Sequence, residues 1–205
     1  MRHPFVLLAG IALAVLAVSP PVHAAAHELF AAHMVQHLIL VLACAPLIAW
    51  GYRLPLKGVF ARPLVVGALH AGVLWAWHLP VLYDRALGFD PLHGLEHLLF
   101  LGTAAGFWAL VLDARSDHFS RVALVFVTAL QSSALGVVIA FAATPLYESH
   151  LGSAPLRGLT PLEDQQLAGA IMWVPAGVVY LVVMMMLLWR AFRSYERLQQ
   201  ATEKP

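Results

Sequence analysis

Long apolar stretches separated by short polar links constrain the fold of this chain more than any other feature. Five of them cover approximately residues 29–50, 63–79, 90–112, 122–143 and 167–189. Each is close to the roughly 17–25 residues that an α-helix needs to cross a bilayer. The chain is 61% hydrophobic and 11% charged over 205 residues, so little is left for a domain outside the membrane. We therefore predict an all-α, polytopic membrane helix bundle with five transmembrane helices.

A shorter apolar run, from Phe5 to Val18, precedes these spans. It is followed by Val22-His23-Ala24, which fits the small-x-small pattern of signal peptidase cleavage. We predict a secretory signal peptide here. The predicted organisation is a signal peptide at 1–24, a helical membrane domain at 25–192 and a cytoplasmic tail at 193–205. The alternative is an uncleaved first span, which gives six transmembrane helices and leaves the later topology unchanged.

Capping signals and prolines mark the limits and bends of the helices. Asp90-Pro91 is typical of an N-cap followed by proline in the first turn. Thr160-Pro161-Leu162-Glu163 has the form of a capping box, which predicts that the last helix begins near Pro161. Pro46 and Pro175 fall inside predicted spans. Pro46 is expected to bend its helix or free a carbonyl, and Pro175 is expected to kink its helix.

The distribution of basic residues predicts the orientation in the membrane. With five spans, nine basic residues fall on one side: Arg53, Lys57, Arg62, Arg115, Arg121, Arg190, Arg193, Arg197 and Lys204. Only Arg85 and Arg157 fall on the other side, and Arg2 belongs to the signal segment. Because cytoplasmic loops are enriched in Lys and Arg, we expect a bacterial inner membrane protein with a periplasmic mature N-terminus and a cytoplasmic C-terminus.

Composition and motifs exclude several classes of function. A formal net charge of +1 gives no electrostatic basis for binding nucleic acid. Cys44 is the only cysteine and lies in an apolar run, so neither a disulfide framework nor a cysteine-based zinc site is expected. The chain has no nucleophile motif, dinucleotide fingerprint or HExxH sequence, and we expect that it is not an enzyme.

Two histidines lie near the beginning of the first predicted span, in the sequence His33-Met34-Val35-Gln36-His37. A helix places them on one face, about 6 Å apart along the axis. Ionisable side chains within a membrane span are expensive and are therefore candidates for a functional site. We expect the other unusual residues to gather around this pair.

Further histidines are expected at the same depth on two other helices. His93 and His97 repeat the four-residue spacing at the start of the third span, and His78 ends the second span just before Pro80. His70 lies two turns deeper than His78, about 12 Å, and is either the floor of this site or an interhelical hydrogen-bond partner.

Imidazole is a common ligand of copper and zinc, so His33, His37, His78, His93 and His97 predict a metal site near the periplasmic surface. Carboxylates often orient such histidines or bind the ion themselves, and Glu96 or Asp164 could fill either role. Met34 and Met172 offer sulfur ligands suited to Cu(I).

The remaining histidines are assigned differently. His3, His23 and His118 are expected to be solvated residues of the terminus and loops. Cleavage after Ala24 would expose Ala25-Ala26-His27 as a new N-terminus. Its amine, two amides and an imidazole would form a square-planar nitrogen set suited to Cu(II).

Several motifs occur between residues 30 and 175. They are His33-Met34-Val35-Gln36-His37 with Ala45-Pro46-Leu47, then Trp77-His78-Leu79-Pro80 with Tyr83-Asp84 and Ala86-Leu87, then His93, Glu96-His97 and Phe100, and finally Asp164-Gln165-Gln166-Leu167-Ala168-Gly169 with Ile171-Met172-Trp173. In this combination the chain resembles the multi-pass CtaG-like cytochrome c oxidase assembly factors. The resemblance implies a role in maturing a haem–copper oxidase at the stage of copper delivery. It places His33, His37, His78, His93, His97 and Asp164 at motif positions.

The expected partners are the lipid bilayer, one or more cytochrome c oxidase subunits and a periplasmic copper chaperone. Two other functions remain open. Histidines on facing helices could ligate a b-type haem, or the chain could be a copper or proton-coupled transporter. The polar layer near one surface argues against transport, because only His70 and Gln131 lie deeper.

Overall fold

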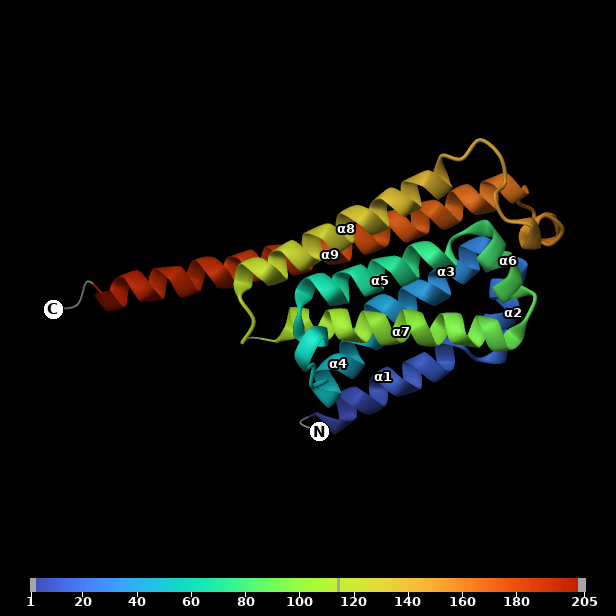
Figure 1. Cartoon of the computed structure of the whole chain (residues 1–205). Helices are drawn as coiled ribbons and strands as arrows, with labels where there is room; N and C mark the ends of the chain where they lie inside the picture. Colours follow the sequence, from blue (N-terminus) through green and yellow to red (C-terminus); the bar gives the residue numbers. More distant parts are fainter. Residues whose placement is uncertain (1–2, 114, 203–205) are drawn as a thin grey trace.

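The computed structural model describes residues 3–113 and 115–202, which form helices and contain no strand (Figure 1). Arg2 and Lys204, two of the basic residues in the orientation argument, lie outside this range. The α-helices are α1 (Pro4–Ala17), α2 (Pro20–Glu28), α3 (Phe30–Leu38), α4 (Ala45–Tyr52), α5 (Pro63–Trp77), α6 (Pro80–Leu87), α7 (Asp90–Leu112), α8 (His118–Ala140) and α9 (Pro161–Thr202). A π-helical turn (Ile39–Cys44) joins α3 to α4, and short 3-10 turns occur at Gly58–Ala61, Glu148–His150 and Ala154–Arg157.

The helices provide four to six membrane spans. Four segments are long and apolar enough to cross alone: Phe30–Tyr52, Asp90–Leu112, His118–Ala140 and Pro161–Arg197. Two bent pairs complete the bundle, α1 with α2 at 49° and α5 with α6 at 73°. The multi-pass helical fold is thus confirmed, and each of the five predicted spans coincides with one of these units.

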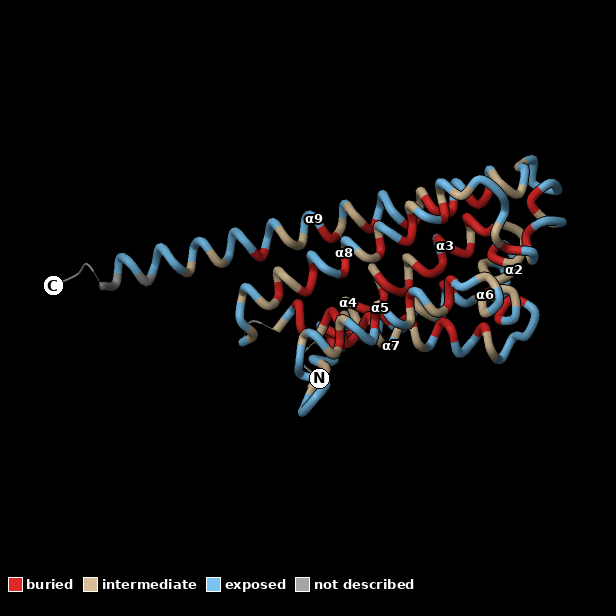
Figure 2. Tube along the Cα trace, turned by 45° about the horizontal axis from the view of Figure 1, so that its top comes forward, coloured by how far each residue is buried: buried red, intermediate tan, exposed pale blue. Residues whose placement is uncertain are grey.

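The two ends of the bundle differ in chemistry. At one end lie α2, α6 and the α8–α9 connection, and we call it the histidine end (Figure 1). At the other lie the α4–α5 and α7–α8 connections, which carry basic residues such as Arg53, Lys57 and Arg115, and we call it the basic end. Beyond the basic end, α9 continues as a largely exposed helix (Figure 2).

The helix predicted as a signal peptide is packed into the bundle. It runs antiparallel to α3 and α4, since a Cβ on Gly51 would come within 2.5 Å of the Leu7 nitrogen, and one on Gly10 within 2.9 Å of the Leu47 Cβ. Gln36 Nε2 donates to the carbonyl of Ala17 at 2.8 Å, at the end of α1. In the full chain, α1 therefore occupies a position that fits a first span.

Pro46 shapes the helix that carries the first histidine pair. Within the π-helical turn, the Ala45 N–H bonds to the carbonyl of Leu40, five residues earlier. By the same spacing the Val41 carbonyl would need an N–H from Pro46, which has none. Trp108 Nε1 donates to that carbonyl instead, at 2.8 Å. The predicted free carbonyl is thus paired with α7, which fixes α3–α4 against α7.

Small residues bring α8 and α9 into close contact. A Cβ on Gly169 would lie 2.5 Å from the backbone nitrogen of Ala140, and one on Gly136 would lie 2.9 Å from the Trp173 Cβ. This packing at small residues is typical of membrane helices, which associate by close backbone approach. It holds α9 against α8 within the first four turns of α9.

The predicted helix starts are largely correct. Thr160 and Glu163 form the reciprocal capping box before α9, with Glu163 N–H donating to Thr160 Oγ1 at 3.2 Å. The predicted cap of α7 is one residue too late, because Phe89 is the N-cap and Asp90 is the first helical residue. Pro175 lies inside α9, which continues through it as one helix.

Candidate metal centre

The two predicted histidine pairs face each other across α3 and α7. His33 Nε2 lies 2.9 Å from His37 Nε2. The ring centroids of His33 and His93 are 5.0 Å apart and stacked, and those of His37 and His97 are 5.4 Å apart. All four side chains are buried, and His33 is fully so. We call these four histidines and Glu96 the inner cluster.

The spacing of nitrogen atoms in the inner cluster is close to that of a metal site. His33, His37 and His97 each offer one nitrogen, and these three atoms lie within 4.8 Å of one another. Copper and zinc bind imidazole nitrogen at about 2.0–2.1 Å, so two nitrogens on one ion are about 3–4 Å apart. Small rotations of the three rings would therefore bring them to one ion.

Glu96 supplies a carboxylate inside the same cluster. Its Oε1 lies 3.6 Å from His37 Nε2 and 3.9 Å from His33 Nε2, and its Oε2 lies 3.9 Å from His93 Nε2. The residue is fully buried, and neither carboxylate oxygen has a hydrogen-bond partner among the described residues. His33, His93 and Glu96 form a second group whose ligand atoms lie within 4.8 Å of one another.

Unpaired nitrogens give the cluster its capacity to hold a cation. Among the described residues, buried ring nitrogens without a hydrogen bond include Nδ1 of His33 and His37, both nitrogens of His93, and Nε2 of His97. Burying such groups without partners costs about 1–3 kcal/mol each, so native proteins rarely gather several of them. A metal ion would take one nitrogen from each ring, so Nε2 of His97 would gain a partner and the His33 Nε2–His37 Nε2 contact would be replaced by bonds to the ion. This donor set fits copper or zinc.

Asp164 positions the cluster from outside it. Its carboxylate accepts from the backbone N–H of Phe30 at 2.7 Å and of Ala31 at 2.9 Å. These are orphan donors of the first turn of α3, the helix that carries His33 and His37. Of the two roles predicted for Asp164, ligand or orienting group, its contacts favour the orienting role, exerted through the helix backbone.

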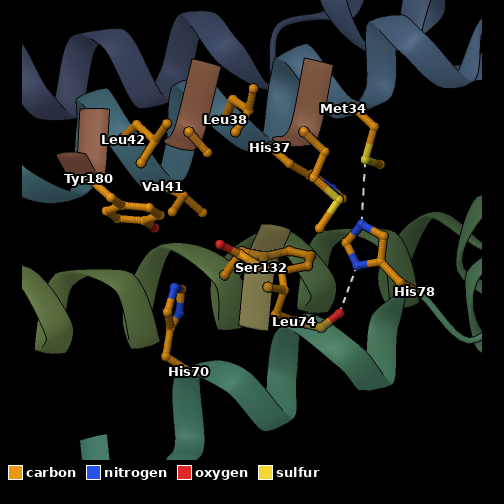
Figure 3. A pocket seen from close by; sticks show the side chains of 13 residues that line it. Met34, His37, Leu38, Val41, Leu42, His70, Leu74, His78, Ser132 and Tyr180 are labelled. Carbon is orange, nitrogen blue, oxygen red and sulfur yellow. Dashed lines mark hydrogen bonds between the residues drawn. The ribbon is translucent and has the colours of Figure 1, made fainter. Parts of the chain in front are cut away.

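His78 lies beside the inner cluster on its deeper side. Its Nδ1 donates a hydrogen bond to the Leu74 carbonyl at 2.7 Å, and its Nε2 is 3.4 Å from the Met34 sulfur (Figure 3). The hydroxyl of Tyr147 donates to the His78 carbonyl at 3.0 Å. The ring centroid of His78 is 6.2 Å from that of His37. The predicted convergence of α3, α5 and α7 at one level therefore holds.

A small pocket continues from His37 and His78 toward the middle of the bundle (Figure 3). Its volume is about 40 Å³, and Met34, Ser132, Met172 and Tyr180 contribute to its lining. His70 also lines it, but its Nδ1 is 3.0 Å from Thr103 Oγ1 and its ring stacks on Phe107. Of the two roles predicted for His70, these contacts favour the interhelical hydrogen-bond partner.

Two histidines lie close to the inner cluster although the sequence did not single them out for it. His23 was predicted to be solvated, but its ring centroid lies 5.0 Å from that of His93. The ring centroid of His27 lies 4.4 Å from that of His23 and 5.4 Å from that of His93. The four-residue spacing of His23 and His27 was the available signal, and it was missed because the segment was assigned to a signal peptide.

The predicted Cu(II) set at Ala25, Ala26 and His27 needs a chain that begins at Ala25. In the full chain these residues lie within α2, and the Ala25 carbonyl accepts from the N–H of Leu29 at 3.0 Å. This site stays a prediction for a cleaved form.

His150 and Tyr83 form another buried polar contact at the histidine end. Tyr83 Oη lies 2.8 Å from His150 Nε2, and the His150 ring stacks on Phe30 with centroids 5.6 Å apart. Burial lowers the pKa of His150, which lies in the α8–α9 connection, to about 4. This contact fastens the connection over the beginning of α3, close to the inner cluster.

Comparison with known proteins identifies the family. No curated protein and no solved structure gave a match. One family model matches residues 2–194, which is nearly the whole chain, and it is described as cytochrome c oxidase caa3 assembly factor (Caa3_CtaG). Its range includes α1 and α2 as well as both histidine pairs. The chain therefore belongs to the family of cytochrome c oxidase caa3 assembly factors.

Proposed function

We propose that this chain binds copper in the inner cluster as cargo and delivers it to a subunit of a caa3-type oxidase. The observation that carries the proposal is the meeting of three imidazoles, from His33, His37 and His97, within 4.8 Å of one another. They lie beside a buried carboxylate with no hydrogen-bond partner among the described residues. The family describes an oxidase assembly factor, and copper is a metal that a haem–copper oxidase must acquire during assembly.

The donor set favours copper over zinc. Imidazole suits both metals, but sulfur ligands select Cu(I). Met34 is buried next to His78, on the same helix as His33 and His37, and Met172 lines the adjoining pocket. Copper could thus exchange between nitrogen and sulfur ligands without leaving this side of the bundle. The carboxylate of Glu96 would offset the charge of the ion within the membrane.

The proposed setting is the bacterial inner membrane, with the histidine end toward the periplasm and the basic end in the cytoplasm. The positive-inside rule supports this orientation, since Arg53, Lys57 and Arg62 occupy the short α4–α5 connection. A periplasmic chaperone would then supply copper to the same end at which an oxidase subunit receives it. The proposed role is binding and transfer, without catalysis.

The haem alternative is weakened by the size of the available space. Pockets for cofactors usually enclose about 300–1,000 Å³, whereas the pocket beside His37 and His78 has a volume of about 40 Å³. The four histidine rings of the inner cluster are in contact, with centroids 4.3 Å apart for both the His33–His37 and His93–His97 pairs. A porphyrin would have to separate these helices.

The transport alternative is weakened by the aromatic packing in the half of the bundle next to the basic end. Phe107, Trp108 and Tyr180 form a continuous aromatic contact there, with ring centroids 5.2 to 6.4 Å apart. The deeper polar groups, His70 and Gln131, already bond to Thr103 and Trp75. Among the described residues, those that line the pocket do not form a polar route to the basic end.

The proposal is tested in cells that lack this gene and receive either the wild-type chain or a variant. His37→Ala should lower both the copper content and the activity of purified caa3 oxidase while the assembly factor still inserts. His118→Ala is the matched control, because His118 lies at the other end of the bundle, at the start of α8. Oxidase with its full copper content from His37→Ala cells would contradict the proposal.

A further inference from the structure

A second group of histidines lies on the surface side of the inner cluster. His23 and His27 are one turn apart on α2, and both rings contact His93 of α7, with centroids 5.0 and 5.4 Å away. One nitrogen from each of the three residues lies within 4.8 Å of one nitrogen of the other two. The ligand nitrogens of the inner cluster lie within the same 4.8 Å limit, and the two groups share only His93.

The second group also has unpaired nitrogens and a graded exposure. His27 Nε2 and both ring nitrogens of His93 are buried without a hydrogen-bond partner among the described residues. His23 and His27 are partly exposed, whereas His93 is 1% exposed. The three side chains thus connect the partly exposed surface of the histidine end to the buried inner cluster.

We propose that His23, His27 and His93 form an outer copper site that receives the ion and passes it to the inner cluster through His93. The proposal rests on the proposed function, because it assigns the same cargo to both sites. It also gives the N-terminal helices a role in binding, which a cleaved signal peptide could not have.

The structure holds α2 in the position that this site needs. Just before α2 begins, the carbonyl of Ala17 accepts a hydrogen bond from Gln36 Nε2 of α3 at 2.8 Å. At its end, the guanidinium of Arg157 forms an ion pair with Glu28. The family match also includes this segment, since it begins at residue 2. A retained α1 would place the N-terminus at the basic end, where the His3 ring lies 5.6 Å from that of Trp50.

Transfer between the two sites requires only ligand exchange. The His93 ring centroid lies 4.3 Å from that of His97 and 5.0 Å from that of His33. His93 can keep its bond to the ion while nitrogens of His33 and His97 replace those of His23 and His27. Each copper–nitrogen bond that breaks is matched by one that forms, and no electron is transferred.

The test is a titration of purified full-length protein with Cu(I) against a competing chelator. We expect about two equivalents for the wild type, one for His23→Ala/His27→Ala and two for the control His118→Ala. His33→Ala/His37→Ala should lose the inner equivalent and keep the outer one. Wild-type stoichiometry and affinity in His23→Ala/His27→Ala would overturn the outer site.

The same titration separates failure of the outer site from failure of the inner one. If only His33→Ala/His37→Ala loses copper, the proposed function stands and the outer site is wrong. If only His23→Ala/His27→Ala loses copper, the outer site stands and the assignment of the inner cluster is wrong. Intact-mass measurement of the membrane protein gives an independent check. We expect a chain that retains His23, and a mature chain that begins at Ala25 would overturn the outer site.

Discussion

The carboxylate of Asp164 accepts a hydrogen bond from the backbone N–H of Phe30, 134 residues earlier in the chain. The bond ties the first turn of α9 to the first turn of α3, and Asp164 also accepts from the N–H of Ala31. Because His33 follows one turn later on α3, Asp164 controls where the first histidine pair is held. An acidic residue far from the histidines in sequence is in this way part of the site's framework.

Asp164→Ala should destabilise the bundle and weaken copper binding together. Removing an N-terminal capping side chain costs about 1–2 kcal/mol, and the buried N–H groups of Phe30 and Ala31 would lose their acceptor. Thermal unfolding in detergent measures the stability, and chelator competition measures the affinity. Gln166→Ala, at an exposed position on the same turn, is the control. An Asp164→Ala protein that unfolds at the wild-type temperature would refute this role.

Glu96→Gln should leave the fold intact and lower copper affinity. The amide keeps the size of the side chain, which lies 3.6 Å from His37 Nε2, but it cannot supply the negative charge that would offset that of a bound ion. Loss of an outer-shell carboxylate typically costs 10–100-fold in metal affinity. Chelator competition with Cu(I) measures the change, and Glu163→Gln at the exposed start of α9 is the control. Equal affinities for Glu96→Gln and the wild type would show that the carboxylate does not act on the ion.

Gly169→Ala should destabilise the contact between α8 and α9. Its Cβ would lie 2.5 Å from the backbone nitrogen of Ala140, so the helices must separate. Overpacking of this kind costs about 1–3 kcal/mol. Gly177→Ala, two turns further along α9, is the matched control, because its Cβ would meet no atom within 4 Å. Similar unfolding temperatures for both variants would rule out close packing at Gly169.

The arrangement of spans could be predicted because the bilayer sets the length of each apolar segment. The sharing of one helical face by His33 and His37, and by His93 and His97, was also predictable from the four-residue spacing. That the two faces meet depends on how α3 packs beside α7. Cleavage of the signal peptide could not be predicted with the same certainty from the sequence. A short apolar run before a small-x-small motif is the same pattern in a cleaved peptide and in a retained helix. In the full chain α1 packs against α4, which fits the alternative of an uncleaved first span.

The contacts that position the site could not be predicted from one sequence. Asp164 was assigned to the site, but which helix it caps depends on how α9 packs beside α3. The same holds for Trp108, whose bond to the Val41 carbonyl exists only because Pro46 leaves that carbonyl unpaired. Such contacts join segments whose separation in sequence carries no periodic signal.

Acidification should release the stabilising contribution of His150. Burial lowers its pKa from the ordinary 6.5 to about 4, so the unfolded chain takes up a proton at a higher pH than the folded chain. The contribution is present above about pH 6.5 and is lost as the pH falls toward 4. The difference in unfolding temperature between wild type and His150→Gln should therefore shrink between pH 7 and pH 4. A constant difference would contradict the burial of a neutral imidazole at this position.

The central claim is that copper binds in the inner cluster through His33, His37 and His97. The most direct measurement is the copper X-ray absorption spectrum of full-length protein loaded with Cu(I), with His23→Ala/His27→Ala as the background so that the inner cluster alone is observed. We predict imidazole scattering from nitrogens at about 2.0 Å, and loss of the bound copper when His33→Ala and His97→Ala are added. Full copper loading with an unchanged spectrum in that variant would contradict the claim.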